Sequence, residues 1–316
     1  MPQPKVSIIL LHIYDFAGLC ECLSSLAKVS YGNFDVFVVH NGPESKGFGE
    51  KLLPFSGTVT EIIHTGGNIG FARGNNIGIS RALQKGADYV LLLNDDTVVS
   101  PDFLGILVNE AENEPLAGML GPEVLYFADR DRVSFSGAKF DPACAIFSFP
   151  RSEEFSHASA ALTPVESDYV TGCALLVKKK LIDKAGLLDE RFFLYWEDAD
   201  WGLRASSAGF KSLVVPASKI WHKISVSMGG MDSPLKAYYK TRGHLLFAEL
   251  HAPHARGKVL LKIARDIAWL VFKSGQPGAF KRAAARLAGV AGYISGNTGA
   301  GPGWLSERAA KGLYAG

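Results

Sequence analysis

The first 121 residues alternate apolar, strand-like runs with amphipathic, helix-like runs, and this alternation restricts the fold more than any other feature of the chain. The strand-like runs cover residues 6–11, 34–39, 58–64 and 88–93, and the helix-like runs cover residues 15–28, 73–85 and 101–113. Such a chain forms parallel strands whose right-handed crossovers place helices on both faces of one sheet. We therefore predict an α/β fold with a mostly parallel, Rossmann-like sheet.

The regular alternation ends near residue 121 and gives way to short β segments and loops rich in Gly, Pro and Ser. An apolar strand is expected again at residues 169–178, followed by a helix at residues 199–208. With 316 residues, 47% of them hydrophobic, the chain can bury a sizeable core. We predict an α/β domain over residues 1–233 and a helical extension over residues 234–316.

The few cysteines and the amino terminus predict a cytoplasmic protein. The four cysteines match neither a paired zinc site nor a dense disulfide framework. The first residues run directly into a strand and lack the long apolar core of a signal peptide.

The charge is unevenly distributed along the chain. Residues 252–316 carry ten Lys and Arg against two Asp and Glu, a net +8, so residues 1–251 carry −6 of the overall +2. Residues 258–273 form a basic, amphipathic helical pattern with Trp269, which predicts either a helix in a membrane interface or a helical hairpin packed on the protein or on a second subunit of a homodimer. Residues 296–303 are typical of a flexible linker. A nucleic-acid partner is not expected, because the basic residues lack interleaved aromatic ones.

Two adjacent carboxylates end the fourth predicted strand. Asn94, Asp95 and Asp96 follow four large apolar residues, which is where open α/β sheets bind their ligands. Neighbouring carboxylates repel each other unless water, a cation or hydrogen-bond donors offset their charge. A solvated turn that caps the next helix is the alternative interpretation.

A glycine- and asparagine-rich loop, residues 66–78, follows the third predicted strand and opens a helix. It contains neither the dinucleotide fingerprint nor a Walker loop. Arg73, Asn75 and Asn76 are donors suited to a diphosphate or a ribose, although such a sequence can also be a simple turn.

An acidic pair follows an aromatic run at residues 192–196. Glu197 and Asp198 precede a helix, so they can cap it, but a carboxylate beside Tyr195, Trp196 and Trp201 is also placed as a general base next to a sugar ring. Asp200 and Arg204 are four residues apart and are expected to pair with each other.

His222 is a candidate metal ligand. It is expected to follow a short strand at residues 212–215 and a turn at Pro216, and the glycine- and serine-rich residues 223–233 after it are typical of a mobile lid. A histidine can complete a metal shell that Asp96 begins. An isolated histidine usually has a structural role, and we interpret His12, His64, His157 and His251 in this way.

In their order along the chain, these motifs resemble those of the inverting family-two glycosyltransferases with the GT-A nucleotide-sugar-binding fold, over residues 5–250. The resemblance rests on residues 6–11, 67–76, 91–97, 168–172 and 195–201. Within the family the sequence is most similar to bacterial rhamnosyltransferases and, around residues 196–204, to galactofuranosyltransferases.

The resemblance implies a role for each motif. Asp198 would be the general base, and Asp96 and His222 would hold Mg²⁺ or Mn²⁺. The donor would be a dTDP- or UDP-linked sugar, and His40 stands where many members carry an Asp that reads the nucleobase. The implied donor site comprises Leu11, His12, His40, Asn41, Asn68, Arg73, Asn76, Asn94 and Asp95. The implied acceptor site comprises Trp196, Glu197 and Trp201.

The resemblance also suggests a glycan or polyprenyl-linked acceptor, used at the inner face of the cytoplasmic membrane. Two other functions are considered. A catalytically inactive nucleotide-sugar-binding scaffold would account for His40. A nucleotidyltransferase is expected to carry a glycine- and basic-rich loop after its first strand, and residues 11–16 offer none.

Overall fold

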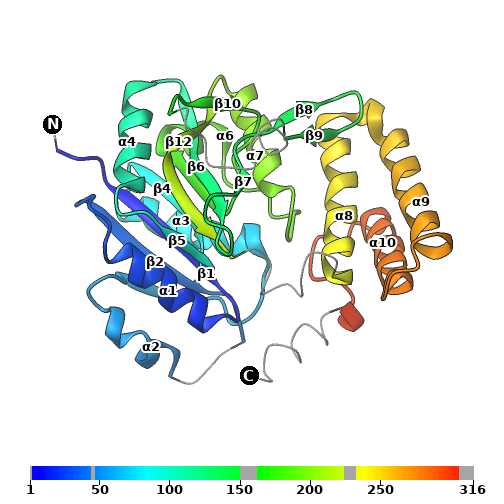
Figure 1. Ribbon diagram of the computed structural model, residues 1–316, viewed down its shortest axis with the longest axis horizontal. Helices are drawn as coiled ribbons and strands as arrows, with labels where there is room; N and C mark the ends of the chain where they lie inside the picture. Colours follow the sequence, from blue (N-terminus) through cyan, green and yellow to red (C-terminus); the bar gives the residue numbers. More distant parts are fainter. Residues whose placement is uncertain (1, 44–46, 150–161, 224–232, 306–316) are drawn as a thin grey trace.

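The computed structural model describes residues 2–43, 47–149, 162–223 and 233–305 of the protein (Figure 1). Four parallel strands form one half of its large sheet, and their bounds are β1 (Val6–His12), β2 (Phe34–His40), β3 (Glu61–His64) and β4 (Tyr89–Asn94). The helices between and after them are α1 (Phe16–Leu26), α3 (Phe71–Gln84) and α4 (Phe103–Asn113). The predicted α/β fold is confirmed, although the third strand is shorter than residues 58–64.

The order of the strands creates a switch point beside β1. Within the described residues the sheet runs β10-β12-β6-β11-β4-β1-β2-β3. The chain therefore leaves β1 toward β2 and β3 on one side and returns to β4 on the other. The ends of β1 and β4 lie in register, with Leu11 opposite Asn94. Ligands of open α/β sheets bind at such a point, outside the carboxyl ends of the strands.

The other half of the sheet is mixed. Its long strands are β6 (Ala117–Tyr126), β11 (Ala174–Lys178) and β12 (Lys211–His222), with β11 antiparallel to both β4 and β6. The short strands are β5 (Thr97–Val99), β7 (Val133–Phe135) and β10 (Val165–Ser167), while β8 (Lys139–Asp141) and β9 (Ile146–Ser148) form a separate hairpin. The shorter helices are α2 (Phe48–Lys51), α6 (Lys179–Ala185) and α7 (Glu197–Ser207). Only the second half of the strand expected at residues 169–178 forms.

The prediction of a short strand and a turn before His222 was wrong. β12 continues to His222, and its register with β6 shifts between Val215 and Lys219. Pro216 lies in this irregularity, where its missing N–H disturbs no regular ladder. The continuous strand brings His222 opposite Thr97 of β5, next to Asp96. Most of the predicted lid, residues 224–232, lies outside the described residues.

Three helices follow the sheet: α8 (Pro234–His251), α9 (Arg256–Phe272) and α10 (Ala279–Ile294). Phe247 of α8 packs on Phe140, Phe147 and Trp196, so α8 contacts both the hairpin and the segment before α7. Helices α9 and α10 pack on α8 and form the outer layer on the right of Figure 1. No helix in the described part of the chain is long and apolar enough to cross a membrane. The division at residue 233 stays an interpretation.

The segment after α10 is held against α8, so the prediction of a flexible linker at residues 296–303 was wrong. Arg242 donates to the carbonyl oxygens of Gly299 (2.6 Å) and Thr298 (3.4 Å). The amide of Gly301 donates to the Tyr239 hydroxyl over 2.9 Å. A Cβ atom on Gly301 would lie 2.9 Å from the Tyr238 ring, so only glycine permits this approach.

Replacing Arg242 with Met should release this segment. Arg242 is 4% exposed, and its charge is satisfied by carbonyl oxygens and by the rings of Tyr238 and Tyr239. We expect Arg242→Met to lower the free energy of unfolding by about 2 kcal/mol, measured by urea denaturation. The matched control is Arg265→Met on the exposed side of α9, where the change should stay within about 0.5 kcal/mol. Equal effects of the two variants would contradict an anchoring role for Arg242.

Candidate active site

A cleft of about 460 Å³ opens at the switch point, where the carboxyl ends of β1 and β4 meet the start of α7. The end of β12 and the first turns of α8 complete its wall. Eight residues predicted from the sequence line this cleft, and they come from five separate segments of the chain. They are Leu11, Asn68, Asn94, Asp95, Asp96, Glu197, Asp198 and His222.

Asp96 and His222 face each other in the cleft. Asp96 Oδ1 lies 3.0 Å from His222 Nε2, and Asn94 Nδ2 lies 3.5 Å from the same nitrogen. Asp96 is 5% exposed, yet its Oδ1 has no hydrogen bond of acceptable geometry to any described residue. A buried carboxylate oxygen and an imidazole nitrogen that converge in this way are the donor set of a divalent cation.

The protein thus offers two ligands for a cation. The described residues contain no group of three or more His, Cys, Asp or Glu that would hold a metal by itself. Mg²⁺ and related ions at phosphate sites are commonly held by one or two protein groups, with substrate phosphate and water in the other positions. The residues present therefore fit a cation that is bound together with a diphosphate.

Asp95 is held by His12 instead. His12 Nδ1 lies 2.6 Å from Asp95 Oδ2, and His12 itself is buried beneath the cleft. Burial raises the pKa of Asp95, while the His12 contact opposes this rise. His12 was expected in the donor site, and the structure places it behind Asp95, where it fixes the carboxylate from the protein side.

Asp198 is held in the cleft by two backbone amides. One carboxylate oxygen accepts a hydrogen bond from the amide of Gly172 (2.9 Å), and the other accepts one from the amide of Ala199 (2.8 Å). Burial raises the pKa of Asp198, and these amide hydrogen bonds limit the rise. A carboxylate with a raised pKa takes up a proton more readily and remains fixed in direction by the two amides.

Glu197 lies beside Asp198 and is 5% exposed. Its Oε2 has no hydrogen-bond partner among the described residues. Burial raises the pKa of Glu197 well above its usual range, and the charge of Asp198 adds to the effect. The raised pKa means that Glu197 takes up a proton more readily than an exposed glutamate, and a protonated carboxyl group can donate a hydrogen bond.

The acidic pair follows two residues with left-handed backbone. Tyr195 has φ 68° and Trp196 has φ 79°, which is rare for residues other than glycine and is found where surrounding packing imposes it. Here the packing comes from α8: Trp196 Nε1 donates to Lys240 O (3.1 Å), and its ring stacks on His244 at 4.4 Å. Gly243 of α8 lies against both residues.

His40 lies in a buried aromatic stack next to the cleft. Its ring stacks on Phe48 with centroids 4.1 Å apart, and His40 Nδ1 lies 3.3 Å from His64 Nδ1. Burial lowers the pKa of His40, and His12 and His64 lower it further. His40 is thus neutral at pH 7, and it does not line the cleft.

Several predicted donor residues stabilise the loops around the cleft. Asn41 is fully buried, and its side chain forms hydrogen bonds with Thr65, Ile69 and Gly70. These hydrogen bonds fix the loop that carries Asn68. The Asn76 side chain donates a hydrogen bond to the Leu188 carbonyl and accepts one from the Leu188 amide. These hydrogen bonds give the two asparagines a positioning role at a distance from the cleft.

Three further side chains lie outside the cleft. Arg73 is exposed and lies 3.7 Å from Glu190 on the outer side of α3. Trp201 is fully buried, and its Nε1 donates to Gly186 O over 2.9 Å. Trp196 packs against α8, as described above. The sequence pattern of aromatic residues around the acidic pair therefore reflected packing at Trp196 and Trp201.

The structure adds cleft residues that the sequence did not single out. Tyr14 extends from the end of β1, Thr171 and Cys173 flank Gly172, and Tyr239 and Ala300 come from the C-terminal region. Thr171 and Cys173 lie in or next to the sequence motif at residues 168–172, which indicated this part of the site. Ala300 had no signal, because it reaches the cleft only through the contacts of the terminal segment with α8.

Comparison with known proteins identifies the family. The family model described as "Glycosyltransferase like family 2" matches residues 4–243. The chain belongs to this family. The resemblance inferred from the motifs is confirmed, and α9 and α10 lie beyond the matched region.

Two relatives and one solved structure are similar to this chain. The dTDP-rhamnosyl transferase RfbF of Shigella flexneri is 30% identical over 200 residues, covering 61% of this chain and 64% of RfbF. The N-acetylglucosaminyl-diphospho-decaprenol L-rhamnosyltransferase of Mycobacterium tuberculosis is 28% identical over 209 residues, covering 60% of this chain and 67% of the relative. The crystal structure of GalNAc-T7 with UDP, GalNAc and Mn²⁺ has a TM-score of 0.63 at 12% identity, covering 99% of this chain and 57% of GalNAc-T7. These structural data confirm the GT-A fold of this glycosyltransferase-family chain.

Adding a methyl group at Gly243 should disturb the acidic pair. A Cβ atom there would lie 2.7 Å from Trp196 Cδ1 and 3.1 Å from Tyr195 O. We expect Gly243→Ala to lower the free energy of unfolding by about 1–3 kcal/mol and to change the near-ultraviolet circular dichroism of Trp196. The matched control is Gly257→Ala in α9, where nothing lies within 4 Å of the added atom. An unchanged spectrum and unfolding midpoint in Gly243→Ala would show that α8 does not hold the Tyr195–Trp196 turn.

Proposed function

We propose that the protein is an inverting, metal-dependent glycosyltransferase that moves a sugar from a nucleoside diphosphate to an acceptor hydroxyl. The observation that carries this proposal is the meeting, in one cleft, of Asp198 with the Asp96–His222 pair. One group is suited to activate a hydroxyl, and the pair is suited to bind a cation beside a leaving diphosphate. Family membership supports the reaction class.

The donor diphosphate is proposed to bind at the carboxyl end of β4. Asp96 and His222 would hold Mg²⁺ or Mn²⁺, which neutralises charge on the diphosphate as it departs. Asn94 and Asn68 line the same cleft and offer amide donors to the nucleotide sugar. The crystal structure of GalNAc-T7 holds Mn²⁺ together with UDP, which supports this choice of ion.

The chemical step is proposed as a single displacement. Asp198 takes the proton of the acceptor hydroxyl, and the hydroxyl oxygen bonds to the anomeric carbon as the bond from that carbon to the diphosphate oxygen breaks. Attack from the face opposite the leaving group inverts the anomeric configuration. The amides of Gly172 and Ala199 keep the Asp198 carboxylate directed during the transfer.

The donor is proposed to be dTDP-linked rhamnose or a similar sugar, with UDP as the other candidate nucleotide. The name of the Shigella relative, a dTDP-rhamnosyl transferase, supports this choice. His40 is proposed to read the pyrimidine once Phe48 moves aside, because a neutral imidazole both donates and accepts a hydrogen bond. Glu197, which lines the same cleft, is proposed to bind a hydroxyl group of the acceptor sugar.

The acceptor is proposed to be a glycan on a polyprenyl carrier. The name of the M. tuberculosis relative includes a decaprenol-linked acceptor, which supports this class. Such an acceptor would place the reaction at the inner face of the cytoplasmic membrane. An inactive scaffold remains the competing interpretation, and the Asp198 experiment below separates it from an enzyme.

Asp198→Asn should remove the base and leave the nucleotide site in place. We expect transfer from dTDP-rhamnose to a polyprenyl-diphosphate-linked N-acetylglucosamine to fall by about 10²–10⁴-fold, with dTDP binding unchanged. Because the pKa of Asp198 is raised, the base becomes protonated as the pH falls at values above the ordinary aspartate range. The acid limb of the wild-type rate profile should therefore lie above that range. The control is Asp183→Asn on the exposed face of α6. Transfer at the wild-type rate in Asp198→Asn would exclude this base, and absence of transfer by the wild type would contradict the donor–acceptor pair.

Asp96→Ala should abolish the metal dependence of nucleotide binding. We expect wild-type protein to bind dTDP or UDP more tightly with Mn²⁺ than with EDTA, because a cation held by Asp96 would offset the negative charge of the diphosphate. Titration calorimetry measures both conditions, and the preferred nucleotide identifies the base. Binding of equal strength with and without Mn²⁺ in the wild type would contradict the metal site.

A further inference from the structure

The outer layer formed by α9 and α10 exposes large apolar side chains to an unusual extent. On α9, Leu261 is 61% exposed, Trp269 48% and Phe272 82%. On α10, Phe280 is 71% exposed, Leu287 57% and Ile294 76%. We call these six residues the α9–α10 surface. Large apolar side chains exposed together on two neighbouring helices are a feature of interaction sites.

The apolar residues of each helix form a stripe. Leu261, Ala264, Ala268 and Phe272 recur at intervals of three and four residues and are all exposed, so they follow one side of α9. Phe280, Ala284, Leu287, Ala291 and Ile294 do the same on α10. The buried sides of these helices carry other residues, such as Val259, Ile263 and Leu270. The exposed stripes are therefore not required to hold the three helices together.

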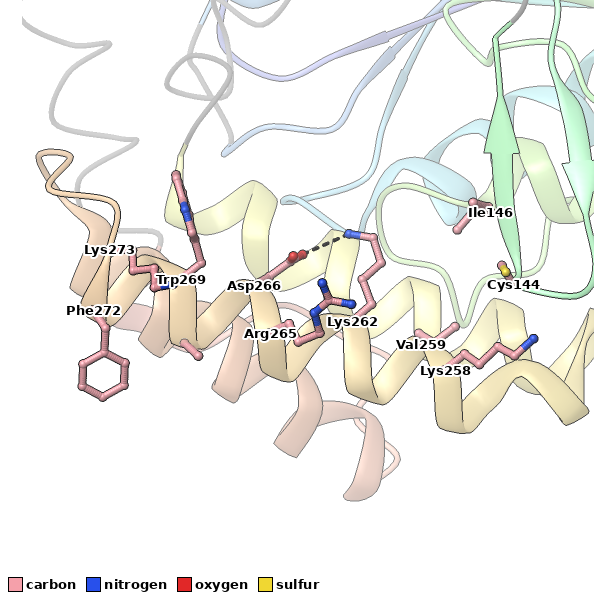
Figure 2. Close-up of a pocket in the computed structure, with 11 residues that line it drawn as sticks. Cys144, Ile146, Lys258, Val259, Lys262, Arg265, Asp266, Trp269, Phe272 and Lys273 are labelled. Atoms are coloured by element: carbon pink, nitrogen blue, oxygen red, sulfur yellow. Dashed lines mark hydrogen bonds and ion pairs between the residues drawn. The ribbon is translucent and has the colours of Figure 1, made fainter.

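A row of cations borders the α9 stripe. Lys258, Lys262, Arg265 and Lys273 line a groove of about 770 Å³ between α9 and the β8–β9 hairpin, which contributes Ile146 (Figure 2). Figure 2 shows Phe272 directed away from the body of the protein, below this row. Cations beside exposed Trp and Phe are typical of a helix that lies in a membrane interface.

The charge of this region has one sign. Residues 256–294 contain eight Lys and Arg and a single acid, Asp266. Asp266 is engaged by Lys262 at 3.1 Å and by Arg286 at 3.5 Å. No ion pair within the described part of the chain involves Arg265 or Lys273. Within the described residues, the groove therefore carries positive charge at Arg265 and Lys273 that no ion pair offsets.

We propose that the α9–α10 surface docks the protein on a bilayer of anionic phospholipids. The apolar stripes would enter the interface, and the cation row would contact the phosphate groups. A symmetric dimer through the same surface would bring two basic rows together, and their repulsion disfavours it. The docking elements lie beyond residues 4–243, so this inference goes beyond the family match and the proposed transfer reaction.

Docking would place the cleft close to lipid-linked molecules. Helix α8 carries Leu235 and Tyr239 of the cleft wall at one end and packs directly on α9 and α10. An acceptor whose lipid tail stays in the bilayer would then need to extend only its sugar head toward Asp198. This consequence rests on the proposed function, whereas the docking itself does not.

Vesicle co-sedimentation tests the docking. We expect the full chain to bind phosphatidylcholine vesicles that contain phosphatidylglycerol, and to bind pure phosphatidylcholine vesicles at least about 10-fold more weakly. Added salt should weaken binding, because the lysine and arginine charges are screened. The Arg265→Glu/Lys273→Glu double variant and the Leu261→Glu/Phe272→Glu double variant should each lose about 10-fold or more in vesicle affinity.

Controls keep folding and transfer separate from docking. Leu53→Glu changes a leucine of matching exposure (66%) next to α2 and should bind vesicles like the wild type. Calorimetric binding of dTDP, measured on each variant, reports the nucleotide site independently; its absence in all proteins would contradict the proposed function and leave the vesicle result standing. Equal binding to neutral and anionic vesicles, or no binding, would overturn the proposal. A dimer in light scattering that Leu261→Glu/Phe272→Glu dissociates would overturn it as well and would assign the surface to a second copy.

Discussion

Five carboxylates line one partly buried cleft. Four of them form the adjacent pairs Asp95–Asp96 and Glu197–Asp198, and the mutual repulsion of these four is the constraint on which the site depends. The negative charges of these carboxylates are offset in different ways. His12 holds Asp95, two backbone amides hold Asp198, and burial raises the pKa of Glu197, which favours its neutral form. Asp96 Oδ1 and Glu197 Oε2 are buried oxygens without a hydrogen bond within the described residues, and Asp96 Oδ1 lies 3.0 Å from His222 Nε2. The Asp96–His222 pair therefore fits a bound cation, whose charge would offset that of the carboxylates.

Helix α8 connects this chemistry to the C-terminal region. Its residues impose the left-handed turn at Tyr195–Trp196 that aims the acidic pair, and its Arg242 and Tyr239 hold the segment after α10 beside the cleft. The same helix is the support on which α9 and α10 pack. Helix α8 thus contacts both the cleft and the outer helices α9 and α10.

Much of the fold could be predicted from periodicity, because buried parallel strands and amphipathic helices have distinct apolar patterns. The acidic groups at Asn94–Asp96 and Glu197–Asp198 could be predicted because they end a strand and begin a helix, where side chains reach ligands. The sequence pattern could not distinguish Trp201, Asn76 and Asn41, which have packing or loop-stabilising roles, from residues that bind a ligand. Aromatic and amide side chains serve packing, loops and ligands equally well, and only their partners distinguish these uses.

By itself, the sequence determined the α/β architecture, the family and the identity of the chemical groups, because these follow from local pattern and side-chain type. Only the tertiary structure decided which groups meet. β12 had to continue past Pro216 to bring His222 to Asp96, across more than a hundred residues of chain. Ala300 had to return along α8 to reach the cleft. Contacts between distant segments depend on the packing of whole elements, and local sequence carries no record of them.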